Sequence, residues 1–150
     1  PAHVLGKRRP LPRRVYLGTL IMGMQVLADL AVVAAGGAIG CMSRYGVEHI
    51  GIFDNDKYYY TVAINITGCI IIGVLWALLH YWNADRMWYL FLLTGLLGGY
   101  TTYSAFTLDA MELVQQGRAM QALFYIAITF IGGLGGCAIG LFGTEHLLKQ

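Results

Sequence analysis

The chain has 150 residues, of which 57% are hydrophobic and 12% are charged, with a net charge of +2 and a mean hydropathy of +0.60. A soluble domain carries about 25% charged residues, so this composition excludes an ordinary soluble protein and indicates a single integral-membrane domain. The three cysteines, Cys41, Cys69 and Cys137, are isolated in apolar segments, which argues against a disulfide framework or a zinc site.

The amino end is a basic arm. Residues 1–14 contain five of the ten basic residues, which are Lys7, Arg8, Arg9, Arg13 and Arg14. We interpret the arm as a positive-inside topology signal, and binding of anionic lipid headgroups is the alternative. Residues 15–24 are apolar and fit an interfacial helix or an extended first turn. We therefore expect an arm with an interfacial segment over residues 1–24 and a four-helix transmembrane domain over residues 25–150.

The first two predicted spans cover residues 25–45 and 59–82, each long enough for the roughly 20 residues that a membrane helix needs. Small residues at 36–41 predict close helix contact in the first span. Three tyrosines at 58–60 are typical of an aromatic belt at the membrane edge. Asn65 is the conspicuous polar residue of the second span, and it fits either an interhelical hydrogen bond or the lining of a permeation path.

The third predicted span, residues 87–114, follows a loop at 83–86 that is short enough for a tight antiparallel hairpin with the second span. Its centre, residues 98–106, reads Gly-Gly-Tyr-Thr-Thr-Tyr-Ser-Ala-Phe. Adjacent glycines disfavour a regular helix, and three nearby hydroxyl groups can bond freed backbone groups. Irregular backbone at membrane depth is tolerated only inside protein or along a polar cavity. The stretch therefore predicts a broken helix that forms a site.

Two acidic residues, Asp109 and Glu112, lie three apart near the end of the third span, where the simplest interpretation is a solvated helix end. The fourth predicted span, residues 119–142, places Tyr125 and Thr129 on one helical face. The glycines that follow also permit tight packing. The predicted fold is an all-α membrane protein with four transmembrane helices, the third broken near its centre, and both termini on one side.

The residues offer little for catalysis. The four histidines lie in loops or at span ends, and no metalloprotease, P-loop or nucleophile-elbow motif is present. Nucleic-acid binding is supported only by the basic arm. We therefore expect neither an enzyme nor a nucleic-acid-binding protein.

The remaining class of function is the movement of a small solute across the membrane. We expect no acidic or basic residue at mid-depth, since the nearest one, Asp29, lies early in the first span, whereas a proton-coupled exchanger normally keeps an embedded carboxylate. A passive path lined by amide, hydroxyl and ring-edge groups suits a small, hard anion, and carbonyls freed at a helix break suit a cation. The candidate lining residues are Asn65, Ser104, Tyr125 and Thr129.

The broken stretch resembles the G-G-x-T-T-F-S-T-F signature of the Fluc (CrcB) fluoride channels. The segment at 36–45, which ends in Arg44-Tyr45, and the segment at 62–68 around Asn65 are similar to the first- and second-span patterns of that family. The resemblance extends over nearly all of the chain from about Asp29 onward.

The resemblance implies a passive fluoride channel of the cell membrane that relieves fluoride toxicity, built as a dual-topology antiparallel dimer with two pores. It also implies a structural Na⁺ at the dimer centre, held by the carbonyls of Gly98 and Thr101. Arg44 matches the family arginine, and Asp109 replaces an acidic residue that is usually Glu. The implied fluoride pore comprises Asn65, Tyr103, Ser104, Phe106, Tyr125 and Thr129.

Three departures from the family pattern bear on the pores: Tyr103 replaces Phe, Ala105 replaces Thr, and Gly133 stands where a second Ser is frequent. One alternative is therefore a non-conducting or half-active subunit of a heterodimer. The basic arm favours one membrane orientation, whereas the rest of the chain is balanced as dual topology requires. A small multidrug-type cation exchanger is a further alternative, but residues 30–42 lack the Glu that such exchangers need.

Overall fold

The computed structural model describes residues 13–51 and 57–150, and within these ranges every regular element is a helix. The predicted all-α fold is confirmed for this part of the chain. Most of the basic arm and the loop at 52–56 lie outside the described residues. The elements are α1 (Arg13–Glu48), α2 (Lys57–Tyr81), α3 (Arg86–Trp88), η1 (Tyr89–Leu97), α4 (Gly98–Tyr100), α5 (Tyr103–Gln115) and α6 (Ala119–Leu148).

Three helical segments of the described chain are long and apolar enough to cross a membrane. They are Leu20–Glu48 within α1, the whole of α2, and the whole of α6. Large apolar side chains on all three are exposed, as expected for helices that face lipid or a partner subunit. The molecule is therefore built as a multi-pass membrane protein.

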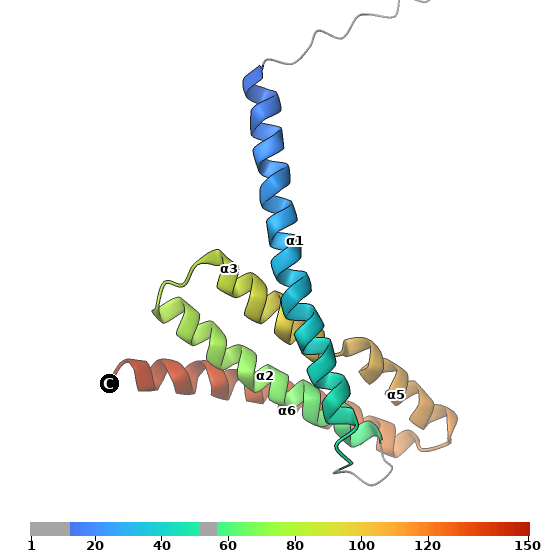
Figure 1. Cartoon of the computed structure of the whole chain (residues 1–150). Helices are drawn as coiled ribbons and strands as arrows, with labels where there is room; N and C mark the ends of the chain where they lie inside the picture. Colours follow the sequence, from blue (N-terminus) through green and yellow to red (C-terminus); the bar gives the residue numbers. More distant parts are fainter. Residues whose placement is uncertain (1–12, 52–56) are drawn as a thin grey trace, which may run out of the picture.

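Helix α1 is continuous over 36 residues, about 54 Å at 1.5 Å per residue. Figure 1 shows its first half extending well away from the other helices. It leaves them near Asp29, whose carboxylate accepts hydrogen bonds of 2.9 and 2.7 Å from Arg86 at the start of α3. Asp29 is thus a paired residue rather than an isolated intramembrane charge. The helix has no break at residue 24, and an interfacial location for residues 15–24 stays a prediction.

The backbone is interrupted between α4 and α5. Thr101 (φ −78°, ψ 158°) and Thr102 (φ −147°, ψ 112°) are extended, and α5 begins at Tyr103. The Thr102 hydroxyl caps α5 by accepting a hydrogen bond of 3.2 Å from the Ala105 N–H. A π-helical segment, η1, precedes the interruption, and only the short helix α4 separates these two irregular pieces of backbone. The interruption falls inside the predicted stretch at residues 98–106.

Glycine allows two tight helix contacts. A side chain at Gly36 or Gly40 of α1 would overlap carbonyl groups of η1, so the predicted close contact of the first small-residue segment is confirmed. In the second contact, Gly136 and Gly140 of α6 lie against Ile70 of α2. Helices α2 and α6 run in the same direction, side by side (Figure 1). The expected hairpin of α2 with the next segment is a minor contact, because α2 packs mainly on α6.

A buried cluster lies where α2, α5 and α6 meet. It contains Ala110 and Leu113 from α5, and Ala122 and Tyr125 from α6, with Phe106 packed against it. This cluster fixes the start of α6 against the second half of the interrupted segment, and so determines which residues of α2, α5 and α6 face the break.

Candidate functional site

The interruption is held by one side chain of α2. The Asn65 amide nitrogen donates to the Thr102 carbonyl at 3.0 Å, and the Asn65 amide oxygen accepts from the Thr102 N–H at 2.8 Å. Because Thr102 is extended, its N–H leaves the preceding helix, and the Asn65 amide bonds both to this N–H and to the carbonyl that begins α5. Asn65 is therefore an interhelical hydrogen-bonding residue. It also lines the groove described below.

The carbonyls of residues 98–101 lose their usual helical donors at the interruption, and for Gly98 and Thr101 the donor is diverted to a side chain. In a continuing helix the Thr102 N–H would bond to Gly98, but it is donated to Asn65. The Ala105 N–H would bond to Thr101, but it is donated to the Thr102 hydroxyl. No other hydrogen bond reaches either carbonyl from the described residues. Gly98 and Thr101 thus have carbonyl oxygens available to a cation, and the donor chemistry fits Na⁺.

Arg44 fixes the break from the side of α1. Its Nε donates to the Gly99 carbonyl at 3.3 Å, and its Nη1 lies 3.8 Å from Glu48. The Gly99 carbonyl, which lies beside Gly98, is therefore occupied by the protein itself. Arg44 is a positioning residue for the broken backbone and does not line the groove.

An open groove of about 460 Å³ runs along the break between α2 and α6. No charged residue lines it within the described chain. Tyr103 projects from its edge with 79% of its surface exposed, and Phe106 is partly buried beneath. The groove brings together six of the predicted site residues, which are Asn65, Gly98, Thr101, Tyr103, Phe106 and Thr129.

The other predicted residues lie beside the groove. The Ser104 hydroxyl is exposed, 3.4 Å from that of Thr102. The Tyr125 ring stacks on Phe106 with centroids 5.4 Å apart, but its hydroxyl donates to Asp109 at 3.1 Å. The hydroxyl of Thr129, which does line the groove, donates to a carbonyl of its own helix at 2.7 Å. The polar side chains of α6 are therefore already hydrogen-bonded within the protein.

Asp109 is buried, with 5% of its surface exposed, so its interpretation as part of a solvated helix end is wrong. Its Oδ2 accepts hydrogen bonds from Thr61 at 2.8 Å and from Tyr125 at 3.1 Å. The Nζ of Lys57 lies 3.7 Å from Oδ1 of Asp109 and 2.5 Å from Oε2 of Glu112, so it forms ion pairs with both carboxylates. Sequence spacing placed Asp109 beside Glu112, but burial by α2 and α6 gives Asp109 a different environment.

Residues 31–141 match the family model described as CrcB-like protein, Camphor Resistance (CrcB). The chain belongs to the CrcB-like family. The first half of α1 precedes the matched region, whereas the break, α2 and most of α6 fall within it.

Curated relatives of this CrcB-like chain are 36–41% identical to it over 73–80% of its length. A protein of Agrobacterium fabrum is 38% identical over 77% of this chain and 94% of its own length, and one of Paracoccus denitrificans is 41% identical over 73% and 88%. A Pseudomonas putida relative is 36% identical over 80% and 99%. Each is named a fluoride-specific ion channel. Because these relatives are channels, they bear out the prediction that the chain is not an enzyme.

Sequence reasoning missed two residues of the CrcB-like site, Thr61 and Lys57. Both hydrogen-bond or pair with the acidic residues of α5. The signal was present, because positions 57, 61 and 65 are spaced by four and form one polar stripe along α2. The helix uses this stripe to hold the start of α5 at two points, through Asp109 and through the backbone of Thr102.

Proposed function

We propose that this chain is a fluoride-selective channel that lets fluoride leave the cell passively, down its gradient. The observation that carries the proposal is the groove along the interrupted backbone, where ring, amide and hydroxyl groups converge without a charged side chain in the lining. Membership of the CrcB-like family and the names of the relatives support fluoride as the ion. An uncharged lining also disfavours the alternative of a proton-coupled exchanger.

The groove can recognise an anion through partial charges. The edges of aromatic rings carry partial positive charge, and Tyr103 and Phe106 lie with centroids 5.8 Å apart at the groove. Asn65 has two N–H donors, of which one is used by Thr102. Such weak donors replace part of the hydration shell of an ion without trapping it, as conduction requires.

We further propose that two copies of the chain pair in opposite membrane orientations. The groove is open, and large apolar side chains rim it, with Phe130 and Leu134 exposed by 65% and 61% beside Tyr103. A second copy placed over this face would enclose the groove and exclude lipid from it. Antiparallel pairing would give two equivalent pores, one along each copy.

A structural Na⁺ completes the proposal. The free carbonyls of Gly98 and Thr101 would hold it, with the same atoms of the partner subunit supplying the remaining ligands. The ion would supply positive charge that binds the two broken segments together at the centre of the dimer. Asn65 and Arg44 support this arrangement, because they fix the backbone on either side of those carbonyls.

The decisive experiment is fluoride efflux from liposomes that contain only this chain, with chloride as the control ion. We expect rapid fluoride efflux, little chloride leakage, and loss of fluoride efflux in Phe106→Ile. The matched variant is Phe142→Ile, because Phe142 is an exposed ring near the far end of α6 and should conduct normally. Absence of efflux from a folded wild-type dimer would refute a homodimeric channel and favour the alternative of a heterodimer subunit.

The Na⁺ proposal has a separate readout. Purified protein should melt at a higher temperature in sodium chloride than in potassium or choline chloride at equal ionic strength, because a ligand bound only by the folded state stabilises it. Saturation at 100 times the dissociation constant would contribute about 2.7 kcal/mol. Equal melting temperatures in all three salts would contradict a structural Na⁺ and leave the fluoride assay unaffected.

A further inference from the structure

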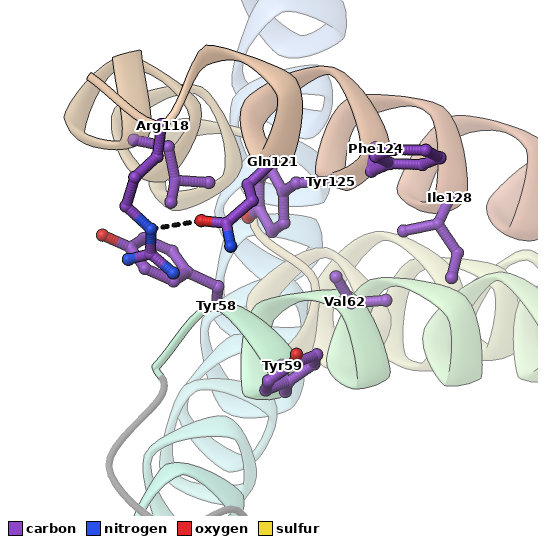
Figure 2. A pocket seen from close by; sticks show the side chains of 9 residues that line it. Tyr58, Tyr59, Val62, Arg118, Gln121, Phe124, Tyr125 and Ile128 are labelled. Carbon is purple, nitrogen blue, oxygen red and sulfur yellow. Dashed lines mark hydrogen bonds between the residues drawn. The ribbon is translucent and has the colours of Figure 1, made fainter. Parts of the chain in front are cut away.

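We call the groove along the broken backbone the conduction groove. A second groove lies between α2 and α6, on the opposite side of α6. Its cavity measures about 260 Å³ and is mostly apolar. Figure 2 shows Tyr58, Tyr59 and Val62 of α2 facing Gln121, Phe124 and Ile128 of α6, with Arg118 at one end. Phe124 and Ile128 are exposed by 70% and 57%, so the groove is open to the surroundings.

Arg118 is unusual among the described cations because no carboxylate of the described residues lies within ion-pair distance of it. Arg44, Lys57, Arg86 and Lys149 each have an acidic partner. The Arg118 guanidinium instead donates to the side-chain oxygens of Gln121 and Gln116, and it lies 5.8 Å from the centre of the Tyr58 ring. Two of its five N–H donors are engaged, so three remain and its positive charge is not neutralised.

The position of this charge in the membrane follows from the two walls of the groove. Helices α2 and α6 are both candidate membrane spans, and they begin side by side at Lys57 and Ala119. Arg118 and the neighbouring tyrosines therefore lie at the membrane edge, where aromatic and basic residues concentrate. Val62, Phe124 and Ile128 follow at increasing depth. The groove is thus positively charged at headgroup level and apolar at acyl-chain level.

We propose that this groove is a binding site for an anionic phospholipid. The phosphate accepts hydrogen bonds from the free donors of Arg118, since a guanidinium matches phosphate geometry in two places at once. One acyl chain lies between α2 and α6 along Val62, Phe124 and Ile128. A lipid fits better than a peptide or a soluble anion because one end of the site needs negative charge and the other needs hydrocarbon.

The site is separate from the conduction groove. Phe130 and Leu134, two of the α6 residues that line the conduction groove, lie on a different face of the helix from Phe124 and Ile128. A partner subunit over the conduction groove would therefore leave the lipid groove exposed. The bound lipid would hold the start of α6 against α2, next to the buried cluster around Tyr125.

The test uses the full-length protein in a neutral detergent, with phosphatidylglycerol added as the anionic lipid and phosphatidylcholine as the zwitterionic one. Native mass spectrometry counts bound lipids, and thermal unfolding measures their effect. We expect phosphatidylglycerol to bind and raise the melting temperature more than phosphatidylcholine. Arg118→Gln should weaken phosphatidylglycerol binding by about tenfold or more, which is the loss expected for hydrogen bonds to a charged group.

The matched control is Lys149→Gln, which removes one positive charge from the other end of α6, where Lys149 is exposed beside Glu145. It should bind phosphatidylglycerol as the wild type does. Ile128→Trp fills the apolar part of the groove without touching Arg118 and should also reduce binding, so the proposal does not depend on one variant folding. Wild-type lipid binding by Arg118→Gln would overturn the proposal. So would an equal thermal shift from inorganic phosphate alone, which would indicate a simple anion site.

Discussion

Replacing Asn65 by Ala tests how the broken backbone is maintained. The substitution removes two hydrogen bonds, of 3.0 and 2.8 Å, and leaves the Thr102 N–H without a partner, whereas the Thr102 carbonyl keeps the first helical hydrogen bond of α5. Leaving a buried polar group unsatisfied costs about 1–3 kcal/mol. The unpaired N–H gives an expected loss of roughly 1–3 kcal/mol, which is a substantial part of the stability of a small protein.

Thermal unfolding of the detergent-purified protein measures this loss. For a chain of this size, 1 kcal/mol shifts the melting temperature by about 2–4 °C, so Asn65→Ala should melt roughly 2–12 °C below the wild type. The control is Ser43→Ala, which removes a polar group from an exposed position on α1. Its melting temperature should stay close to that of the wild type.

The stability measurement separates two roles for Asn65. If the residue only lines the path of the ion, Asn65→Ala would lose fluoride efflux but melt like the wild type, and this result would refute the structural reasoning. Asn65→Asp gives an intermediate case. It keeps the acceptor for the Thr102 N–H, loses the donor to the Thr102 carbonyl, and places a carboxylate beside that carbonyl, so we expect both lower stability and no efflux.

Three further predictions concern residues around the site, and all are measured by thermal unfolding. Gly40→Val should destabilise the protein by about 1–3 kcal/mol because the new side chain overlaps a backbone carbonyl. Gly46→Val, on the same helix, is the control because its side chain has open space. Equal melting temperatures of the two variants would contradict the close contact. Asp109→Ala should cost roughly 2–5 kcal/mol because the hydroxyl groups of Thr61 and Tyr125 lose a charged acceptor. The control is Glu145→Ala, at an exposed site, which should cost no more than about 0.5 kcal/mol. Arg86→Gln should cost at most about 1 kcal/mol because the Arg86 side chain is 69% exposed, and a loss above about 2 kcal/mol would show that its pair with Asp29 fixes α1.

The location of the break was predictable because its causes are local. Two adjacent glycines lower helix stability, and the threonines that follow offer hydroxyl groups to the freed backbone. The structure uses Thr102 in this way, as the cap of α5. The small-residue segment of α1 was predictable for a similar reason, since Gly36 and Gly40 leave room for another backbone.

The partners of the break were not predictable because they depend on how distant helices are arranged. Asn65 reaches Thr102 across 37 residues of chain, and Thr61 reaches Asp109 across 48. These bonds require α2 to lie beside α5. The short loop after α2 suggested instead that α2 pairs with the segment that directly follows this loop. Asp109 was misinterpreted for the same reason, because sequence periodicity shows which residues share a helical face but not what covers that face.

The hydrogen bonds at the break show how the proposed cation site and the proposed anion path could share one short segment. Asn65 takes the N–H that would have bonded to Gly98, and the Thr102 hydroxyl takes the N–H that would have bonded to Thr101. Each diversion leaves a carbonyl oxygen with its negative partial charge free, which suits a cation. The same diversion fixes Thr102 in an extended conformation, and α5 then begins with Tyr103 and Phe106 turned to the groove. Positive ring edges and negative carbonyls are therefore separated by a few residues of backbone, and one amide side chain holds both in place.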